Sequence, residues 1–129
     1  MTSLLLDTHT VLWFWWDEPQ LSAVAKALIC DPANRKFVSM ATPWEVAIKV
    51  SRKKLDIGGT FAGLFDEHMI RTFFEWLQIA TKHLDIVATL PFHHSDPFDR
   101  LIAAQALSEN LPIVSADRQL DPYGVQRLW

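Results

Sequence analysis

Four carboxylic acids in this 129-residue sequence have positions that suit the binding of a divalent cation: Asp7, Glu45, Asp99 and Asp117. Asp7 and Asp117 come just after short apolar runs typical of buried strands, whereas Glu45 and Asp99 stand in the first turn of helix-forming segments. Carboxylate oxygens without His or Cys favour hard ions such as Mg²⁺ or Mn²⁺. Such an ion binds phosphates and generates hydroxide from water, so the chemistry that these acids suggest is phosphodiester cleavage.

Each of these acids also has a simpler, local explanation. Asp7 could cap the helix that follows it, and Asp117 could accept hydrogen bonds from its own turn. Thr42 and Glu45 match the spacing of a capping box, and Glu45 could also pair with Lys49 one turn later. A shared site is favoured by the joint placement of the acids, because helix caps have no reason to converge on one edge of a sheet.

The segment 96–107 predicts a buried helix with an acidic start. Asp96 is a natural N-cap, and Pro97 fits the first helical position. Asp99 shares a face with Ile102, since residues three apart are neighbours on a helix. A carboxylate that faces a core is unfavourable unless a cation or a set of hydrogen-bond donors meets it.

Apolar runs alternate with helix-forming segments along the chain. The expected strands are residues 3–6, 37–40, 112–115 and 124–128, with a further short strand at 78–81. The other expected helices are residues 22–30, 42–54 and 82–90, together with a short helix or turn at 8–16 and one helix or a broken pair of helices at 61–77. This alternation predicts an α/β fold with a mainly parallel sheet, in a single domain over residues 1–129. In such sheets ligands bind at the carboxyl ends of the strands, where the acids would meet. Two carboxylates about 4 Å apart repel by roughly 4 kcal/mol at an effective dielectric constant near 20, so four of them need a cation.

Composition limits the classes of function. The net charge of −3 argues against binding nucleic acid by bulk attraction, but it allows a nucleic-acid enzyme whose cations are metal ions. The lone cysteine, Cys30, cannot form an internal disulfide, which suits a reducing compartment. No apolar stretch approaches the roughly 20 residues that cross a bilayer. We therefore expect a cytoplasmic protein without a membrane partner.

The acids belong to four ordered segments that together resemble a PIN-domain ribonuclease, specifically a VapC-type toxin of a bacterial toxin–antitoxin pair. The matching segments are residues 4–9 with Leu12 and Trp13, 44–49 with Lys54 and Leu55, 94–106, and 114–117. The resemblance implies a three-layer α/β/α PIN-like fold with a central sheet of four to five strands. It also implies an endoribonuclease that depends on Mg²⁺, with Mn²⁺ as a possible substitute.

The acidic motif of this family maps onto the same four residues, Asp7, Glu45, Asp99 and Asp117. Our hypothesis is that Asp7 and Asp99 ligate the ion directly and that Glu45 and Asp117 complete the site, directly or through water. Asp96, which belongs to the same motif, is expected to be an accessory ligand or to contact the ligands. A metal-activated water would attack the phosphate in line and leave a 5′-phosphate and a 3′-hydroxyl. Glu45 could act as a general base or as a ligand, and the sequence leaves both roles open.

Contacts to RNA outside the metal site are expected mainly from basic residues. The candidates are Lys49, Arg52, Lys53 and Lys54, with Arg100, Thr8 and Ser115 beside the acids. The basic cluster could equally be an ordinary solvated helix face, and Arg100 could simply pair with a carboxylate. His9 and His94 are expected to be structural hydrogen-bonding residues rather than metal ligands.

The six Trp residues exceed what one small core needs, and with Phe73, Phe74 and Trp76 they suggest an apolar surface for a partner. The resemblance implies a homodimer and an antitoxin that covers the active site. The nearest alternative is a PIN nuclease that processes RNA without an antitoxin.

Two further alternatives belong to other functional classes. One is a catalytically silent binding module of the same fold, which the intact acidic set argues against. The other is a phosphoacceptor receiver domain, which would need paired acids after the first strand and a Lys after a late strand. Here Thr8 follows Asp7, and Ser115 is followed by Ala116 and Asp117.

Overall fold

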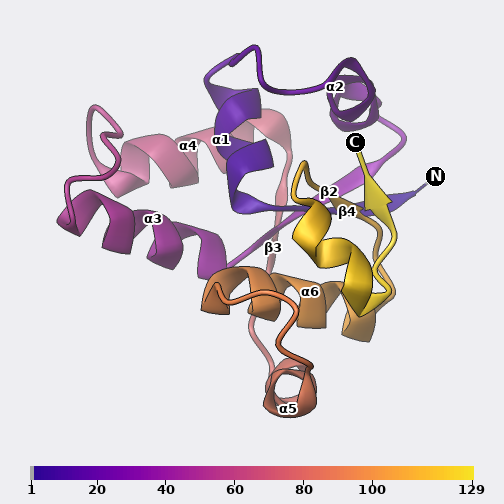
Figure 1. The fold of residues 1–129 in the computed structure, drawn as a ribbon. Coiled ribbons are helices and arrows are strands. Elements are labelled where there is room, and N and C mark those ends of the chain that lie inside the picture. Colours follow the sequence, from indigo (N-terminus) through magenta and orange to yellow (C-terminus); the bar gives the residue numbers. More distant parts are fainter. Residues whose placement is uncertain (1) are drawn as a thin grey trace.

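The computed structural model describes residues 2–129, and its strands form one parallel sheet (Figure 1). The order is β3 (Glu75–Leu77), β2 (Arg35–Ser39), β1 (Ser3–Leu6), β4 (Ile113–Val114) and β5 (Arg127–Leu128). Every neighbouring pair is parallel, so all the carboxyl ends lie at the same edge. The predicted α/β fold with a parallel sheet of four to five strands is confirmed. Met1, the first residue of the predicted domain, lies outside the described residues.

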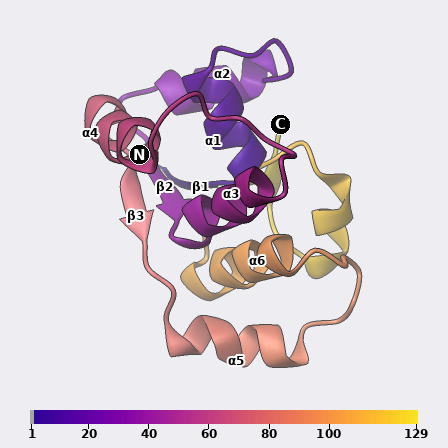
Figure 2. The same ribbon diagram turned by 90° about the vertical axis from the view of Figure 1, so that its left-hand side faces the viewer.

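Helices cover both faces of the sheet (Figures 1 and 2). One layer contains α1 (Thr8–Trp15), α2 (Ala23–Cys30) and α4 (Glu67–Thr72), and the other contains α5 (Thr81–Thr89), α6 (Pro97–Glu109) and the 3₁₀ helix η2 (Arg118–Tyr123). Alternate residues of β1 serve the two layers: Leu4 and Leu6 pack on the first, and Leu5 packs on the second. The central strand is therefore buried on both faces, which confirms the three-layer arrangement.

Helix α3 (Ala41–Ser51) starts directly after β2, at the edge where the strands end. It packs against α1 and α6, and through Val46 it joins a small core with Leu12 of α1. A π-helical turn, η1 (Ala62–Asp66), completes that core and leads into α4. These contacts bring α1, α3 and α6 together around the carboxyl ends of the strands.

Helix α6 begins as the sequence predicts. The Asp96 carboxylate accepts hydrogen bonds from the backbone N–H groups of Phe98 and Asp99, and Pro97 occupies the first turn. The body of the helix is buried, and Asn110 ends it in the left-handed conformation. Within residues 2–129, no helix combines the length and apolar character needed to cross a membrane.

The third strand is where the sequence prediction is wrong. Residues 61–77 were expected to be helical and 78–81 extended, but the helix ends at Thr72 and the strand occupies Glu75–Leu77. Phe73 ends the helix with a φ of 57°, and the strand then pairs with β2, helped by the ion pair between Arg35 and Glu75. A three-residue strand has almost no local pattern, so pairing across the sheet decides its position.

Candidate active site

Asp7 follows β1 and is held on both of its carboxylate oxygens. Its Oδ1 accepts a 2.8 Å hydrogen bond from the backbone N–H of Thr10, so it does cap α1. Its Oδ2 accepts a hydrogen bond from the hydroxyl of Ser115, which follows β4. Burial raises the pKa of Asp7, and the hydrogen bonds from Ser115 and Thr10 oppose that rise. Asp7 is therefore both a cap and a buried, oriented carboxylate.

Glu45 lies on the buried face of α3, where both of its oxygens are engaged. Oε1 accepts a 2.7 Å hydrogen bond from the Thr8 hydroxyl, and Oε2 lies 2.8 Å from the Lys49 ammonium. The pairing of Glu45 with Lys49 is thus confirmed. The capping-box alternative is wrong, because α3 already begins at Ala41 and the Thr42 hydroxyl lies 3.1 Å from that of Thr8.

Asp99 is influenced both by burial and by several neighbouring charges. Burial is the main cause that raises its pKa to about 7, and the negative charges of Asp96, Glu45 and Asp7 add to the rise. His94 lowers the pKa, but its effect is smaller than those of burial, Asp96 and Glu45. Carboxylates from three separate segments therefore act on one another at this edge of the sheet.

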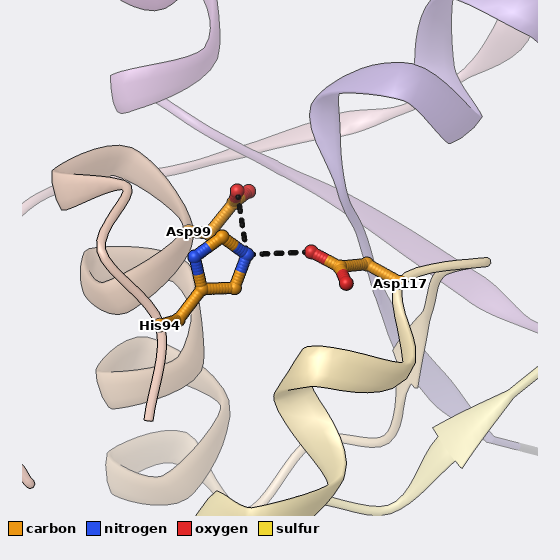
Figure 3. Close-up of side chains that lie close together, drawn as sticks. All are labelled: His94, Asp99 and Asp117. Carbon is orange, nitrogen blue, oxygen red and sulfur yellow. Dashed lines mark hydrogen bonds and ion pairs between the residues drawn. The ribbon is translucent and has the colours of Figure 1, made fainter. Parts of the chain in front are cut away.

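His94 links Asp99 to Asp117 (Figure 3). Its Nε2 lies 3.2 Å from the Asp99 carboxylate and 2.6 Å from that of Asp117. Its Nδ1 accepts a hydrogen bond from the backbone N–H of Asp96, so the proton of the neutral ring belongs on Nε2 and is shared between the two acids. The three side chains offer possible ligand atoms within 4.8 Å of one another. The geometry agrees with a structural, hydrogen-bonding His94.

Asp117 accepts a hydrogen bond from its own turn, as the sequence suggested. Its Oδ1 accepts from the backbone N–H of Gln119 and caps η2. Its other oxygen faces His94. A local capping role and a place in the acidic cluster are therefore compatible for this residue, as they are for Asp7.

A pocket of about 220 Å³ collects three of the four predicted acids. We call it the acidic pocket, and its lining residues are Asp7, His9, Trp13, Asp99, Ala116 and Asp117. Glu45 stands outside this lining, but its charge acts on Asp99. Oxygen donors of this kind fit a hard divalent ion, which would relieve the repulsion that raises the pKa of Asp99. Asp96 uses one carboxylate oxygen, Oδ1, as the cap of α6.

Three residues that the sequence suggested as contacts to RNA form hydrogen bonds within the protein instead. Thr8 and Ser115 are buried, and their hydroxyls donate to Glu45 and Asp7. Arg100 is also buried and donates to the backbone carbonyls of Pro91, Leu90 and Val87, where α5 ends. Its guanidinium is therefore directed away from the acids. The contacts of Arg100 match neither a role in binding RNA nor an ion pair with a carboxylate, the two roles suggested by the sequence.

The basic cluster divides into distinct environments. Lys49 pairs with Glu45, whereas Arg52 and Lys54 form no ion pair with any of residues 2–129. Lys49, Arg52 and Lys54 line a second pocket, of about 490 Å³, that includes Glu45. Lys53 is exposed, has a φ of 57° and does not line that pocket.

Comparison with known proteins gives concordant results. The PIN domain family matches residues 4–125. Ribonuclease VapC22 of Mycobacterium tuberculosis (strain ATCC 25618 / H37Rv) is 28% identical over 123 residues, which cover 93% of this chain and 91% of that protein. The fold is similar to the solved structure of VapBC2 from Rickettsia felis bound to a promoter DNA fragment, with a TM-score of 0.68 and 14% identity over 98% of both chains. It is also similar to FitAcB from Neisseria gonorrhoeae, with a TM-score of 0.66 and 20% identity over 98% of this chain and 96% of the other.

Proposed function

This chain belongs to the PIN-domain family, and from that premise we propose that it is a metal-dependent endoribonuclease that acts as the toxin of a toxin–antitoxin pair. The observation that carries the proposal is the convergence of Asp7, Asp99 and Asp117 on one pocket, with Glu45 close enough to act on Asp99. The similarity to a protein named as a ribonuclease supports RNA as the substrate. Membership of the PIN-domain family argues against the receiver-domain alternative.

In this mechanism Asp7 and Asp99 would hold the divalent ion, and Glu45 and Asp117 would complete the site. Such an ion would supply Lewis acidity for the scissile phosphate and lower the pKa of the attacking water. Ser115 keeps an oxygen of Asp7 oriented, and His94 keeps Asp99 and Asp117 at a fixed separation. Mg²⁺ is the natural ion for these oxygen ligands, and Mn²⁺ would substitute.

Both roles that the sequence leaves open for Glu45, metal ligand and general base, are compatible with its contacts. Thr8 and Lys49 each occupy one of its oxygens. Neither contact blocks either role, because each carboxylate oxygen keeps a second lone pair for a metal ion or a proton.

The test is RNA cleavage by the purified chain with Mg²⁺, compared with the variant Asp7→Asn. Asn still accepts the capping hydrogen bond from Thr10, so the fold should persist while the charge is lost. We expect cleavage by the parent and none by the variant, with fragments that carry 5′-phosphates. Asp85→Asn, on the exposed surface of α5, is the matched control and should cleave normally. Equal cleavage by parent and Asp7→Asn would refute the assignment.

An antitoxin and a second copy of the chain are the proposed protein partners. The similarity to VapBC2 and FitAcB supports the first, and exposed apolar side chains such as Ile70 (75% exposed) and Phe73 (85% exposed) suit either. Co-expression with the product of a neighbouring small open reading frame should give a stable complex with suppressed RNA cleavage. An active chain that lacks such a partner would favour the RNA-processing alternative.

A further inference from the structure

The pocket of about 490 Å³ is built largely from the outer face of α3. We call it the Trp44 pocket, and its lining residues are Trp44, Glu45, Ile48, Lys49, Arg52, Lys54, Asp96, Pro97 and Phe98. Trp44, Ile48 and Arg52 are spaced four apart, so they form one stripe on the helix. This stripe turns away from the buried face of α3, which carries Val46. One wall of the pocket therefore consists of an aromatic side chain, an apolar side chain and a cationic side chain in succession: Trp44, Ile48 and Arg52.

Trp44 is held in place without being covered. Its ring and that of Phe98 form a T-shaped pair, with centroids 5.1 Å apart and an interplanar angle of 86°. Even so, 60% of Trp44 remains exposed. A large, oriented and solvent-exposed aromatic surface is well suited to stacking, because little conformational entropy is lost when a flat ligand binds to it.

The charge of the pocket suits an anionic ligand. Lys49 is already paired with Glu45, and the Asp96 carboxylate caps α6. Arg52 and Lys54 are exposed, and neither forms an ion pair with any other residue in the described part of the chain. They are thus available to a phosphate close to the exposed indole.

Shared lining residues relate the Trp44 pocket to the acidic pocket through a third pocket. A third pocket, of about 230 Å³, shares Lys49 and Lys54 with the Trp44 pocket. It shares His9 with the acidic pocket, where His9 stacks on Trp13 with centroids 5.4 Å apart. A strand laid along these shared residues would run from the acids to the indole.

We propose that the Trp44 pocket binds one unpaired nucleotide of the RNA, with its base stacked on Trp44 and its phosphate held by Arg52 and Lys54. This inference rests on the proposed function and names the form of its substrate. Aromatic platforms beside cations bind single-stranded nucleic acids because every base has a flat face and every nucleotide a phosphate. Bases within a duplex are stacked on each other and cannot reach the indole, so the pocket selects unpaired RNA.

The test measures binding without metal, so that no cleavage occurs. Fluorescently labelled oligonucleotides of uridine or adenosine are titrated with the full chain in EDTA, and anisotropy is recorded. We expect Trp44→Ala to weaken binding by about tenfold or more, as for other base-stacking aromatics, and Trp44→Phe to retain most of it. Phe92→Ala is the matched control, since Phe92 is an exposed aromatic residue that lines none of the three pockets described above. Melting curves verify that each variant is folded.

A second arm locates the base. Single abasic positions are introduced along the oligonucleotide, and one of them should weaken binding by the parent about as much as Trp44→Ala does. Binding by Trp44→Ala should be insensitive to that same abasic position. If each abasic position weakens binding by Trp44→Ala as much as it weakens binding by the parent, no base stacks on Trp44 and the inference is wrong.

The remaining outcomes separate this inference from the proposed function. If the parent cleaves RNA with Mg²⁺ but Trp44→Ala binds oligonucleotides as tightly as the parent, only the nucleotide pocket is refuted. If Trp44→Ala changes the oligomeric state or antitoxin binding and leaves RNA binding intact, the pocket is a protein contact and the inference fails. If the parent neither binds nor cleaves RNA, both proposals fail.

Discussion

The acidic pocket and the Trp44 pocket are neighbouring regions that are built in opposite ways. In the acidic pocket the key carboxylates are held by groups from other segments, as Asp7 is by Ser115 and Asp117 by His94. In the Trp44 pocket the indole is largely exposed, and Arg52 has no ionic partner among residues 2–129. Rigid, pre-oriented groups suit the reacting atoms, whereas exposed and unpaired groups suit the binding of a flexible strand.

Loss of one acid should produce the largest effect. We expect Asp99→Asn to lower Mg²⁺-dependent RNA cleavage by more than about 100-fold, because direct ligands matter more than the groups that orient them. RNA binding in EDTA should change little, since the Trp44 pocket is intact. Initial cleavage rates and anisotropy titrations give the two numbers. If Asp99→Asn weakens RNA binding as much as it slows cleavage, the acidic pocket and the Trp44 pocket do not have separate roles in cleavage and binding.

Loss of an orienting hydroxyl should have a smaller effect on the same pocket. Ser115→Ala leaves an oxygen of the buried Asp7 carboxylate without its donor. We expect cleavage to fall by about 10- to 100-fold and the apparent affinity for Mg²⁺ to fall with it. Ser115→Thr keeps the hydroxyl and should retain most of the activity. If Ser115→Ala is as active as Ser115→Thr, the hydroxyl does not orient Asp7.

The acidic pocket should also destabilise the metal-free fold. The pKa of Asp99 in the folded chain, about 7, lies above its ordinary value of 3.8, so stability should fall as pH rises between these two values and level off above pH 7. Asp99→Asn should remove this loss and be more stable than the parent at pH 8 by roughly 1–3 kcal/mol, with little difference at pH 4. Thermal melts in EDTA at both pH values check the prediction, and a parent that is equally stable at pH 4 and pH 8 would count against it.

The smallest expected effect concerns single cations. Arg52→Gln should reduce the salt dependence of oligonucleotide binding, with the slope of log K against log[salt] falling by about 0.7 for one lost phosphate contact to a single strand. Lys53→Gln is the matched control, because Lys53 does not line the Trp44 pocket. Equal changes in slope for the two variants would mean that the basic cluster acts as a diffuse charged surface.

The parts of the site that depend on local rules could be predicted from the sequence. Asp96 and Pro97 define the start of α6 within a single turn, and Asp7 caps the helix directly after it. The sheet edge then brings the acids together, because parallel strands end on the same side. Local chemistry and topology were therefore sufficient to find the candidate acids.

What the sequence could not provide are the contacts between distant segments. The hydroxyl that holds Asp7 is 108 residues away, at Ser115. The sequence predicts that His94 forms structural hydrogen bonds, but it does not show that the His94 ring joins Asp99 to Asp117. Helical spacing puts Trp44 beside Ile48, yet only the packing of α3 against α1 and α6 decides that Trp44 faces solvent.

The central claim is that the clustered acids form one cation site, and a calorimetric titration of the metal-free chain with Mn²⁺ tests it most directly. The account predicts saturable binding by the parent and by the exposed control Asp85→Asn, and loss of that binding in Asp7→Asn and in Asp99→Asn. Indistinguishable binding by all four proteins would show that the ion does not depend on these carboxylates, and the account would be wrong.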